Sequence, residues 1–425
     1  MSNHLIQPLL TKQYPVAKSA TGIWITDVTG KKYLDGSSGA VTCSLGHSHP
    51  RIIRAISNHS KNLQFVYRSQ FSSDSAEQLA EKLASWSFHG DYHHTFFVNS
   101  GTEAMETAMK TAWQYWQESG APEKRQFITR RKSYHGITMG ALSLSGHYLR
   151  RKRFEDLLES YPMLTSDLMN DTAEQQADEL QQTIDRLGAG SVAAFVAEPV
   201  VGAAGTAITP PPGYYQRMKE VCLKNNILFI ADEVMTGLGR TGKRFGLDHW
   251  NCSADIVAVG KSLGAGYAPI AATLMTQKIL EPIKNGSGLI MSGHTYSGHP
   301  LSCAIALEVL CTIEDEDLLE NVQLRSEQLM TGLKNLQHSY DFIRSVQGKG
   351  LMTGMEFDTD QKGLQQRLIQ KCFENGLLVY PSVGGKEGKD ENGILITPPF
   401  IIKTDEMDVL LGLLDKSLRE VYLAS

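Results

Sequence analysis

The stretch that decides the fold reads ILFIADEVMTGLGRTGKRFGLDHWNCSADIVAVGK and spans residues 227–261. It contains two short apolar runs; Asp232 follows the first run directly, and Lys261 follows the second run after Gly260. Such runs are typical of strands that are buried on both faces of a parallel sheet. If the two strands are parallel neighbours, Asp232 and Lys261 emerge at the same carboxyl edge, where open α/β sheets bind ligands.

An acid and an amine that converge at this edge indicate pyridoxal phosphate, which enzymes hold through a lysine Schiff base and an aspartate on the pyridinium nitrogen. Simpler interpretations exist for each residue alone. Asp232 can be an ordinary cap for backbone N–H groups, and Lys261 can be a solvated charge. Other parts of the chain must decide between them.

The composition bounds the class of protein. A chain of 425 residues with 41% hydrophobic residues can bury a substantial core, and its length predicts two domains. The net charge of -5 argues against a nucleic-acid-binding surface. No apolar run approaches the roughly 20 residues of a membrane span, and the first residues lack the apolar core of a secretory signal. We therefore expect a cytoplasmic protein whose six cysteines, without C-x-x-C spacing, are reduced and bind no metal.

A second motif suits a phosphate. An expected strand over residues 95–98 leads into NSGTEA, in which Ser100 and Glu103 have the spacing of a capping box and predict a helix start. The Ser-Gly-Thr turn presents backbone N–H groups, two hydroxyls and the positive end of a helix dipole. An ordinary capped helix is the alternative interpretation.

Apolar strands and helical patterns alternate from about residue 95 to residue 275, which predicts a mainly parallel sheet covered by helices. One expected strand, at 191–197, ends at Glu198. In the loop after the expected strand 127–129, the ring of Tyr134 could lie flat on a heterocycle or simply be a packing residue. The basic cluster at 150–153 is interpreted as a solvated surface.

Two glycine-rich stretches are not assigned to a cofactor site. GLGRTG, at 237–242, matches the spacing of a dinucleotide-binding loop, but it does not follow a strand directly and no strong helical pattern opens at Gly242. The charged stretch at 381–393 predicts a surface loop. Beyond about residue 316, short strands and amphipathic helices predict a small α+β domain. We expect this domain to comprise residues 1–48, including a hairpin, and 317–425, with a large domain at 49–316.

Taken together, the motifs resemble those of the class III (subgroup II) pyridoxal-phosphate aminotransferases, especially the ω-amino acid and amine:pyruvate members. The resemblance covers nearly the whole chain, and the motifs occur in the family's order: NSGTEA, SYHG, EP with a glycine-rich continuation, DEVMTGLGRTG, VGKSLGAGYAPI and HTYSGHP. It implies a type I aminotransferase fold of the α/β class, with a mainly parallel seven-stranded sheet and a small α+β domain. It also implies pyridoxal 5'-phosphate as the cofactor and a homodimer, or a tetramer, with active sites at the subunit interface.

The resemblance assigns roles to individual residues. Lys261 would bind the cofactor covalently and later move a proton, and Asp232 would pair with the pyridinium nitrogen. The remaining cofactor contacts would be Ser100, Gly101 and Thr102 at the phosphate, Thr295 of the partner subunit at the same phosphate, Tyr134 and Val234 on the two ring faces, and His135 and Glu198 near the ring.

The resemblance fails where the substrate would bind. At two positions where family members carry an arginine for the substrate carboxylate, this chain has Leu395 and Tyr380. Because an arginine–carboxylate pair is charge-assisted and bidentate, either another cation replaces it or the donor is a plain amine. The candidate cations are Lys386, Lys389 and Arg68. The apolar Met235 favours ω-amino acid and amine donors. Val41 stands where some of these members carry a bulky aromatic residue, which indicates a roomier donor pocket.

We therefore expect a transaminase that moves an amino group from an ω-amino acid or primary amine to a 2-oxo acid, most simply pyruvate, by a ping-pong mechanism. A racemase, an aminomutase or a lyase on the same fold is the first alternative. A nicotinamide-dependent dehydrogenase that uses GLGRTG and a non-enzymatic binding protein are more distant ones.

Overall fold

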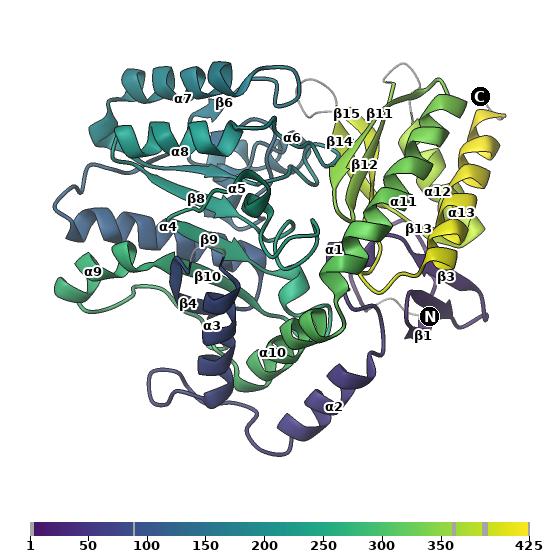
Figure 1. The fold of residues 1–425 in the computed structure, drawn as a ribbon, viewed down its shortest axis with the longest axis horizontal. Coiled ribbons are helices and arrows are strands. Elements are labelled where there is room, and N and C mark those ends of the chain that lie inside the picture. Colours follow the sequence, from purple (N-terminus) through teal and green to yellow (C-terminus); the bar gives the residue numbers. More distant parts are fainter. Residues whose placement is uncertain (1–3, 88–89, 359–362, 385–389, 424–425) are drawn as a thin grey trace.

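The computed structural model describes residues 4–87, 90–358, 363–384 and 390–423. Its centre is a seven-stranded sheet with the strand order β4-β10-β9-β8-β7-β5-β6 (Figure 1). The strands are β4 (Tyr92–Val98), β5 (Gln126–Arg130), β6 (Met163–Leu164), β7 (Val192–Ala197), β8 (Leu228–Asp232), β9 (Ile256–Val259) and β10 (Ala271–Thr276). Neighbouring strands from β9 to β6 run parallel, whereas β10 is antiparallel to both of its neighbours. The prediction of a mainly parallel, seven-stranded sheet is confirmed.

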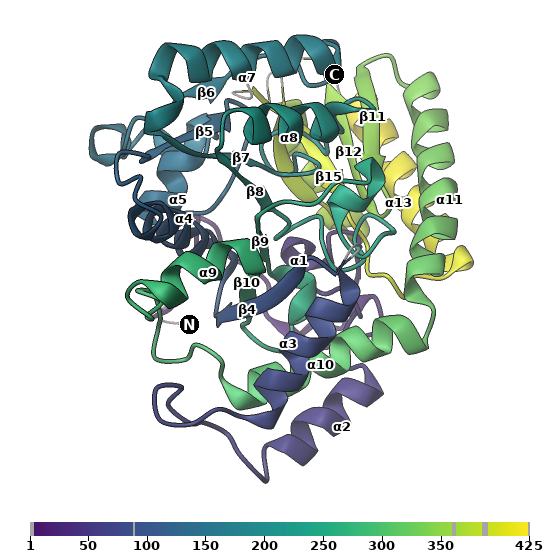
Figure 2. The same ribbon diagram turned by 60° about the vertical axis from the view of Figure 1, so that its left-hand side comes forward.

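Helices cover both faces of this sheet. The helices of this part are α2 (Pro50–His59), α3 (Asp74–Trp86), α4 (Gly101–Glu118), α5 (Met139–Leu144), α6 (Tyr148–Arg151), α7 (Ala173–Leu187), α8 (Tyr214–Lys224), α9 (Gln277–Asn285) and α10 (Pro300–Asp315). Figure 2 shows β8 together with α4, α7, α8 and α9. In β8, Leu228 and Ile230 pack in the core formed with α4 and α9, whereas Phe229 and Ala231 pack in the core formed with α7 and α8. Every residue of β8 is buried, which explains its uninterrupted apolar sequence.

The C-terminal part contains a four-stranded sheet with the order β11-β12-β15-β14. Its elements are α11 (Leu318–Ser339), β11 (Ile343–Lys349), β12 (Met352–Phe357), α12 (Leu364–Asn375), β13 (Leu377–Leu378), β14 (Tyr380–Gly384), β15 (Asp390–Ile396) and α13 (Thr404–Tyr422). Figure 1 shows α11, α12 and α13 beside this sheet. The N-terminal strands β1 (Ala17–Thr21), β2 (Trp24–Asp27) and β3 (Lys32–Asp35) form another sheet, in which β3 pairs with β13. The proposed domain boundaries stay a prediction.

The prediction of a surface loop at 381–393 is wrong at both ends of the stretch that the structure describes. Residues 380–384 and 390–396 are the antiparallel strands β14 and β15, and residues 385–389 lie outside the described part. Gly393 permits a close backbone approach, because a Cβ atom there would lie 2.0 Å from Cγ2 of Thr206. The glycine at position 393 is therefore explained by close packing against Thr206, not by a flexible loop.

None of the helices in the described part of the chain combines the length and the apolar character that a bilayer crossing needs.

Candidate active site

Asp232 and Lys261 meet at the carboxyl edge of the large sheet, as the opening stretch predicts. Parallel pairing of β8 with β9 sets Asp232 opposite Ala258, and both Asp232 and Lys261 line one cavity of about 270 Å³. The chain passes Gly260 and turns sharply at Lys261, which has a φ of 42°. A positive φ at a non-glycine residue is uncommon and strained, so the backbone here holds the lysine in a conformation that it would not adopt freely.

The carboxylate of Asp232 is fixed on both oxygens. Oδ2 lies 2.8 Å from Nδ1 of His135, and Oδ1 accepts a hydrogen bond of 3.1 Å from the backbone N–H of Val234. Nε2 of His135 lies 3.3 Å from the hydroxyl of Thr129. The local bond to Val234 is the capping contact that the simpler interpretation expects, but the buried histidine adds a partner from a distant loop. The result is a buried, oriented carboxylate at the wall of the cavity.

The amine of Lys261 is poised for proton transfer. Its Nζ donates a hydrogen bond of 2.6 Å to the backbone carbonyl of Ala40. The pKa of Lys261 is lowered to about 8, chiefly because the amine is buried; Asp232 opposes this shift, while the charges of Arg240 and Arg150 contribute to it. A lysine with such a pKa carries a usable neutral fraction near neutral pH, whereas an ordinary lysine, with a pKa near 10.4, does not.

Glu198 supports the loop that carries Tyr134. One carboxylate oxygen accepts a hydrogen bond of 2.9 Å from the backbone N–H of Tyr134, and the other accepts one of 3.2 Å from Gly202. Burial raises the pKa of Glu198 to about 6, and the charge of His135 opposes this shift. Glu198 therefore lines the cavity and holds the aromatic residue in place.

The N-terminus of α4 forms the end of the cavity that suits a phosphate. Ser100 caps the helix, since its Oγ accepts a hydrogen bond of 3.4 Å from Glu103 N–H. The first N–H groups of a helix have no intrahelical partner and favour anions. Thr102 Oγ1 accepts hydrogen bonds of 3.2 Å from the N–H groups of Ile137 and Thr138, which draws the loop after Tyr134 onto the helix.

Two glycines allow the walls of this cavity to approach each other. A Cβ atom on Gly101 would lie 2.5 Å from Cγ1 of Val234, and one on Gly136 would lie 2.3 Å from Oγ1 of Thr102. Val234 thus packs against the start of α4 at the edge of the space. This narrow cavity fits pyridoxal phosphate, because it combines a helix end that binds anions, a buried carboxylate and an amine that is partly neutral near pH 7.

Eight predicted residues line this single cavity, namely Gly101, Thr102, Tyr134, His135, Glu198, Asp232, Val234 and Lys261. Ser100 lies directly before Gly101 as the helix cap. Thr295 does not join them; it lines a separate cavity of about 740 Å³ with Tyr67, Arg68 and Glu103. Its predicted contact with a phosphate in a second subunit stays a prediction.

The positions discussed for the substrate differ in their surroundings. Tyr380 and Met235 line the cavity of Lys261, whereas Leu395 is fully buried in β15. Arg68 is held elsewhere, because its guanidinium donates to the carbonyl of Ser292 at 2.7 Å. The other two candidate cations, Lys386 and Lys389, lie outside the described residues. Val41 is buried.

The basic cluster at 150–153 is only partly a solvated surface, so this prediction is wrong for two of its members. Arg151 donates hydrogen bonds of 2.9 Å to the carbonyls of Leu142, Ser143 and Ser145 at the end of α5. The Arg150 guanidinium lies 4.7 Å from the centre of the Tyr134 ring. No sequence pattern separates these arginines from their exposed neighbours, because the sequence does not reveal where the four-residue helix α6 packs.

The GLGRTG stretch connects two parts of the protein. Arg240 is fully buried and donates hydrogen bonds to the carbonyls of Leu351 at 3.0 Å and Pro398 at 2.7 Å. No helix begins at Gly242, since the next helical segment in this described region is a short 3₁₀ turn at Gly246–Trp250. The interpretation of these glycines as structural agrees with this geometry, which lacks the helix of a dinucleotide-binding loop.

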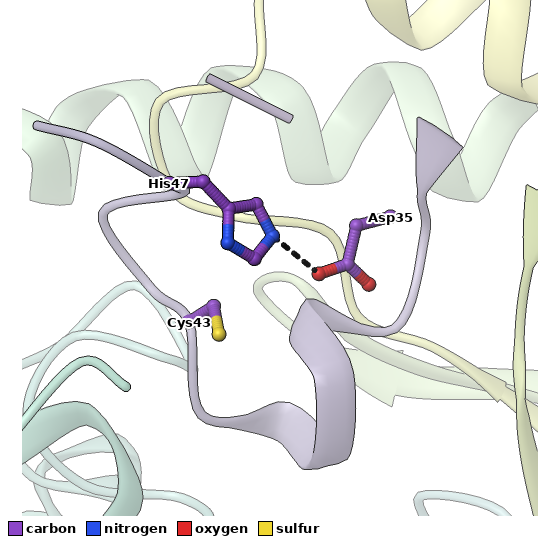
Figure 3. Close-up of side chains that lie close together, drawn as sticks. All are labelled: Asp35, Cys43 and His47. Atoms are coloured by element: carbon purple, nitrogen blue, oxygen red, sulfur yellow. Dashed lines mark hydrogen bonds and ion pairs between the residues drawn. The ribbon is translucent and has the colours of Figure 1, made fainter. Parts of the chain in front are cut away.

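Asp35, Cys43 and His47 bring three potential ligand atoms within 4.8 Å of one another (Figure 3). Both oxygens of Asp35 accept from Gly39 N–H at 2.9 Å, and one lies 3.2 Å from Nε2 of His47. Burial raises the pKa of the Cys43 thiol to about 11, so the thiolate that a metal needs is scarce at neutral pH. Asp35 fixes the turn that precedes the Ala40 carbonyl, since it accepts hydrogen bonds from the N–H groups of Ser37 and Gly39.

Comparison with known proteins relates this chain to aminotransferases. A model of the aminotransferase class-III family matches residues 10–418. The chain is 47% identical to the aminotransferase YodT of Bacillus subtilis (strain 168), over 99% of this chain and 98% of that protein. It is 35% identical to the chloroplastic gamma aminobutyrate transaminase 3 of Solanum lycopersicum, over 95% of this chain and 80% of that protein.

The structure matches an amine transaminase from an uncultivated Pseudomonas species, solved with pyridoxal phosphate bound, with a TM-score of 0.92 and 32% identity over 99% of both chains. The fold is therefore the type I fold of pyridoxal-phosphate-dependent transaminases, and pyridoxal phosphate is the cofactor. The protein is an enzyme that transfers amino groups, and the chain belongs to the class-III aminotransferase family.

Proposed function

We propose that this aminotransferase takes the amino group from an ω-amino acid or a primary amine and passes it to a 2-oxo acid, pyruvate above all, by a ping-pong mechanism. The observation that carries the proposal is the amine of Lys261, with a pKa lowered to about 8, in the same cavity as the buried carboxylate of Asp232. The names of two related proteins, a gamma aminobutyrate transaminase and an amine transaminase, support the donor class.

Pyridoxal phosphate, when bound, supplies a ring that accepts the electrons released when a substrate C–H bond is broken. Asp232 would hold its negative charge beside the protonated ring nitrogen, and His135 keeps that carboxylate oriented at 2.8 Å. The Nζ of Lys261 would take the proton from the substrate carbon that carries the amino group and would pass it to the cofactor. A neutral amine is required for the first of these steps, and the lowered pKa provides it.

The outer wall of the cavity suits an extended aliphatic donor. Besides the polar groups, the cavity is lined by Ile137, Ala203, Val234, Met235 and Tyr380. Apolar side chains of this kind favour the methylene groups of a substrate and exclude water from the reacting carbon.

We also propose a homodimer, or a tetramer of the same chain, in which the sites are shared. Large apolar side chains are exposed on two adjoining segments, including Phe65 and Phe71 on one and Met291 and Tyr296 on the other. The ring centroids of Phe65 and Tyr296 lie 5.8 Å apart, and Thr295 lies in the same loop as Tyr296. An exposed apolar patch of this kind supports a protein–protein interface. Residence in the cytoplasm stays part of the proposal.

Half-reactions test the function. The loaded enzyme is mixed with a donor alone, and its visible absorbance is followed; a transaminase converts once and then stops until pyruvate is added. Release of alanine in amounts equal to the aldehyde or oxo product would support the proposal. Continued turnover without any oxo acid would instead indicate a racemase, an aminomutase or a lyase, and would contradict it.

A further inference from the structure

The cavity needs a cation if the donor carries a carboxylate. Leu395 is buried and apolar, and Tyr380, which lines the cavity, has no cationic group, so neither can form an ion pair with an anionic substrate. A carboxylate transferred from water into an apolar pocket without a cation loses its hydration at a large cost in free energy. A cation for such a carboxylate must therefore come from a position other than 380 or 395.

Arg150 of α6 lies against the aromatic residue of the cavity. Its guanidinium carbon is 4.7 Å from the centre of the Tyr134 ring, and Nη1 is 3.4 Å from the Tyr134 hydroxyl. Tyr134 itself lines the cavity together with Lys261. The positive charge of Arg150 also lowers the pKa of the Lys261 amine, which places the guanidinium within electrostatic range of the reacting end.

The guanidinium of Arg150 is available to an anion. Arg150 is not among the arginines that form ion pairs within the described residues, and its hydrogen bond to the Tyr134 hydroxyl is 3.4 Å long. The two acids of the cavity are engaged by other groups, because His135 holds Asp232 while Tyr134 and Gly202 donate to Glu198.

The other arginines near the site are already occupied. Arg130 donates to the carbonyl of Glu198, Arg151 to three carbonyls at the end of α5, and Arg240 to the carbonyls of Leu351 and Pro398. Guanidiniums committed to backbone carbonyls in this way have few donors left for a ligand. Among these arginines, Arg150 keeps most of its five N–H donors free.

We propose that Arg150 binds the carboxylate of the donor and so makes an ω-amino acid, rather than a plain amine, the preferred substrate. This inference rests on the proposed function and narrows its donor class. Two N–H groups of the guanidinium would hold the two carboxylate oxygens, while the methylene chain of the donor lies along Tyr134 and Met235. The amino group at the other end then reaches the position of Lys261.

The donor half-reaction tests this inference without interference from the carboxylate of pyruvate. Wild type, Arg150→Met and Arg150→Lys are loaded with cofactor, and the concentration dependence of conversion is measured with 4-aminobutanoate and with butylamine. Longer and shorter ω-amino acids, each with the amine of equal length, extend the series. Arg153→Met is the matched control, because Arg153 belongs to the same basic cluster but is exposed.

We expect wild type to prefer the ω-amino acid. Arg150→Met should lower kcat/KM for 4-aminobutanoate by about 10- to 100-fold, the range for a hydrogen bond between charged groups, and should change butylamine by less than about 3-fold. Arg150→Lys should fall between the two, because a lysine keeps the charge but loses the bidentate geometry. Arg153→Met should behave as wild type.

An equal loss with both donors would show that Arg150 only supports Tyr134, and would overturn the inference while leaving the proposed function intact. Wild type that converts amines but no ω-amino acid would overturn it as well. If no donor reacts, the proposed function fails, and binding of butanoate, measured by titration calorimetry, still decides the role of Arg150. Butanoate binding that is weakened by Arg150→Met but not by Arg153→Met supports the role, and equal binding refutes it.

Discussion

The two cavities beside the start of α4 are built in different ways. The cavity of Lys261 is formed by side chains at the ends of buried strands, and its acids have partners within 3.2 Å in the same chain. The cavity of Thr295 is formed largely by the loop at 291–296 and by residues 67–68, with exposed side chains such as Met291. The residues of the reacting end therefore lie together within one chain, whereas the exposed apolar side chains beside the second cavity support the proposed interface between subunits.

Replacing Lys261 by alanine should destroy the first cavity's chemistry and cause the largest effect. Loss of the general acid–base group alone is expected to lower kcat toward the upper end of about 10²- to 10⁴-fold. Steady-state transamination with pyruvate measures the change, and far-ultraviolet circular dichroism checks the fold. Lys243→Ala, at an exposed lysine, should keep full activity. Comparable activity in the Lys261→Ala enzyme would show that the lysine is not the proton carrier.

Asp232→Asn should follow, with kcat reduced by about 10² to 10³-fold. An asparagine preserves the shape but removes the charge, and breaking a buried ion pair typically costs about 3–5 kcal/mol. The same steady-state assay measures the loss. Asp248→Asn serves as the comparison, since Asp248 lies outside this cavity. If Asp232→Asn retains near wild-type kcat, the carboxylate is only a structural partner of His135.

Gly101→Ala should weaken cofactor binding. The added Cβ would lie 2.5 Å from Cγ1 of Val234, and relief of such crowding typically costs about 1–3 kcal/mol. Titration of the cofactor-free enzyme with pyridoxal phosphate should show an affinity lower by about 10- to 100-fold. Gly412→Ala is the control, because no heavy atom lies within 4 Å of a Cβ built there. Unchanged affinity in Gly101→Ala would mean that the cavity wall yields freely.

The reactivity of Lys261 should follow a titration near pH 8. Only the neutral form of its amine could bond the aldehyde that pyridoxal phosphate would supply, and this form becomes scarce as the pH falls below the lowered pKa of about 8. From pH 7 to pH 9 the neutral fraction, and with it the initial rate of reconstitution, should rise about tenfold and then level off. A rate that still climbs steeply beyond pH 9.5 would assign an ordinary lysine pKa.

Thr295→Ala should give the smallest effect, a cofactor affinity lower by about 3- to 10-fold from the loss of one hydrogen bond to the phosphate. Its location is tested with a hybrid dimer of one Thr295→Ala chain and one Lys261→Ala chain. If Thr295 serves the partner subunit, the site with an intact Lys261 receives an intact Thr295 and binds the cofactor as wild type does. If that site keeps the weaker affinity, Thr295 serves its own chain.

The reacting end of the site could be predicted from the sequence because strand burial dictates it. Apolar runs that end abruptly at Asp232 and before Lys261 place both side chains at one sheet edge, and parallel pairing then brings them together. Ser100 and Gly101 could also be predicted from the sequence, because a cap marks the start of a helix after a strand. Local chemistry and sheet topology were sufficient in both cases.

The remaining parts depend on contacts that no local pattern encodes. Arg150 was interpreted as surface because its neighbours are equally basic, and only the packing of α6 against Tyr134 distinguishes it. Residues 381–393 look like a surface loop in the sequence, because glycines that permit close packing, such as Gly393, resemble turn signals, whereas the described residues at both ends belong to β14 and β15. The carbonyl of Ala40, which accepts the Lys261 hydrogen bond, carries no side-chain signal.

The most direct test of the account is to locate the covalent bond between the protein and its cofactor. The loaded enzyme is reduced with borohydride and digested, and the modified peptide is sequenced by mass spectrometry. We predict that the visible absorbance of the enzyme is bleached and that the reduced cofactor is attached to Lys261, with an unmodified Lys132 and Lys278 in the same digest. Attachment to another lysine, or no attachment at all, would contradict the placement of the active site at the end of β9.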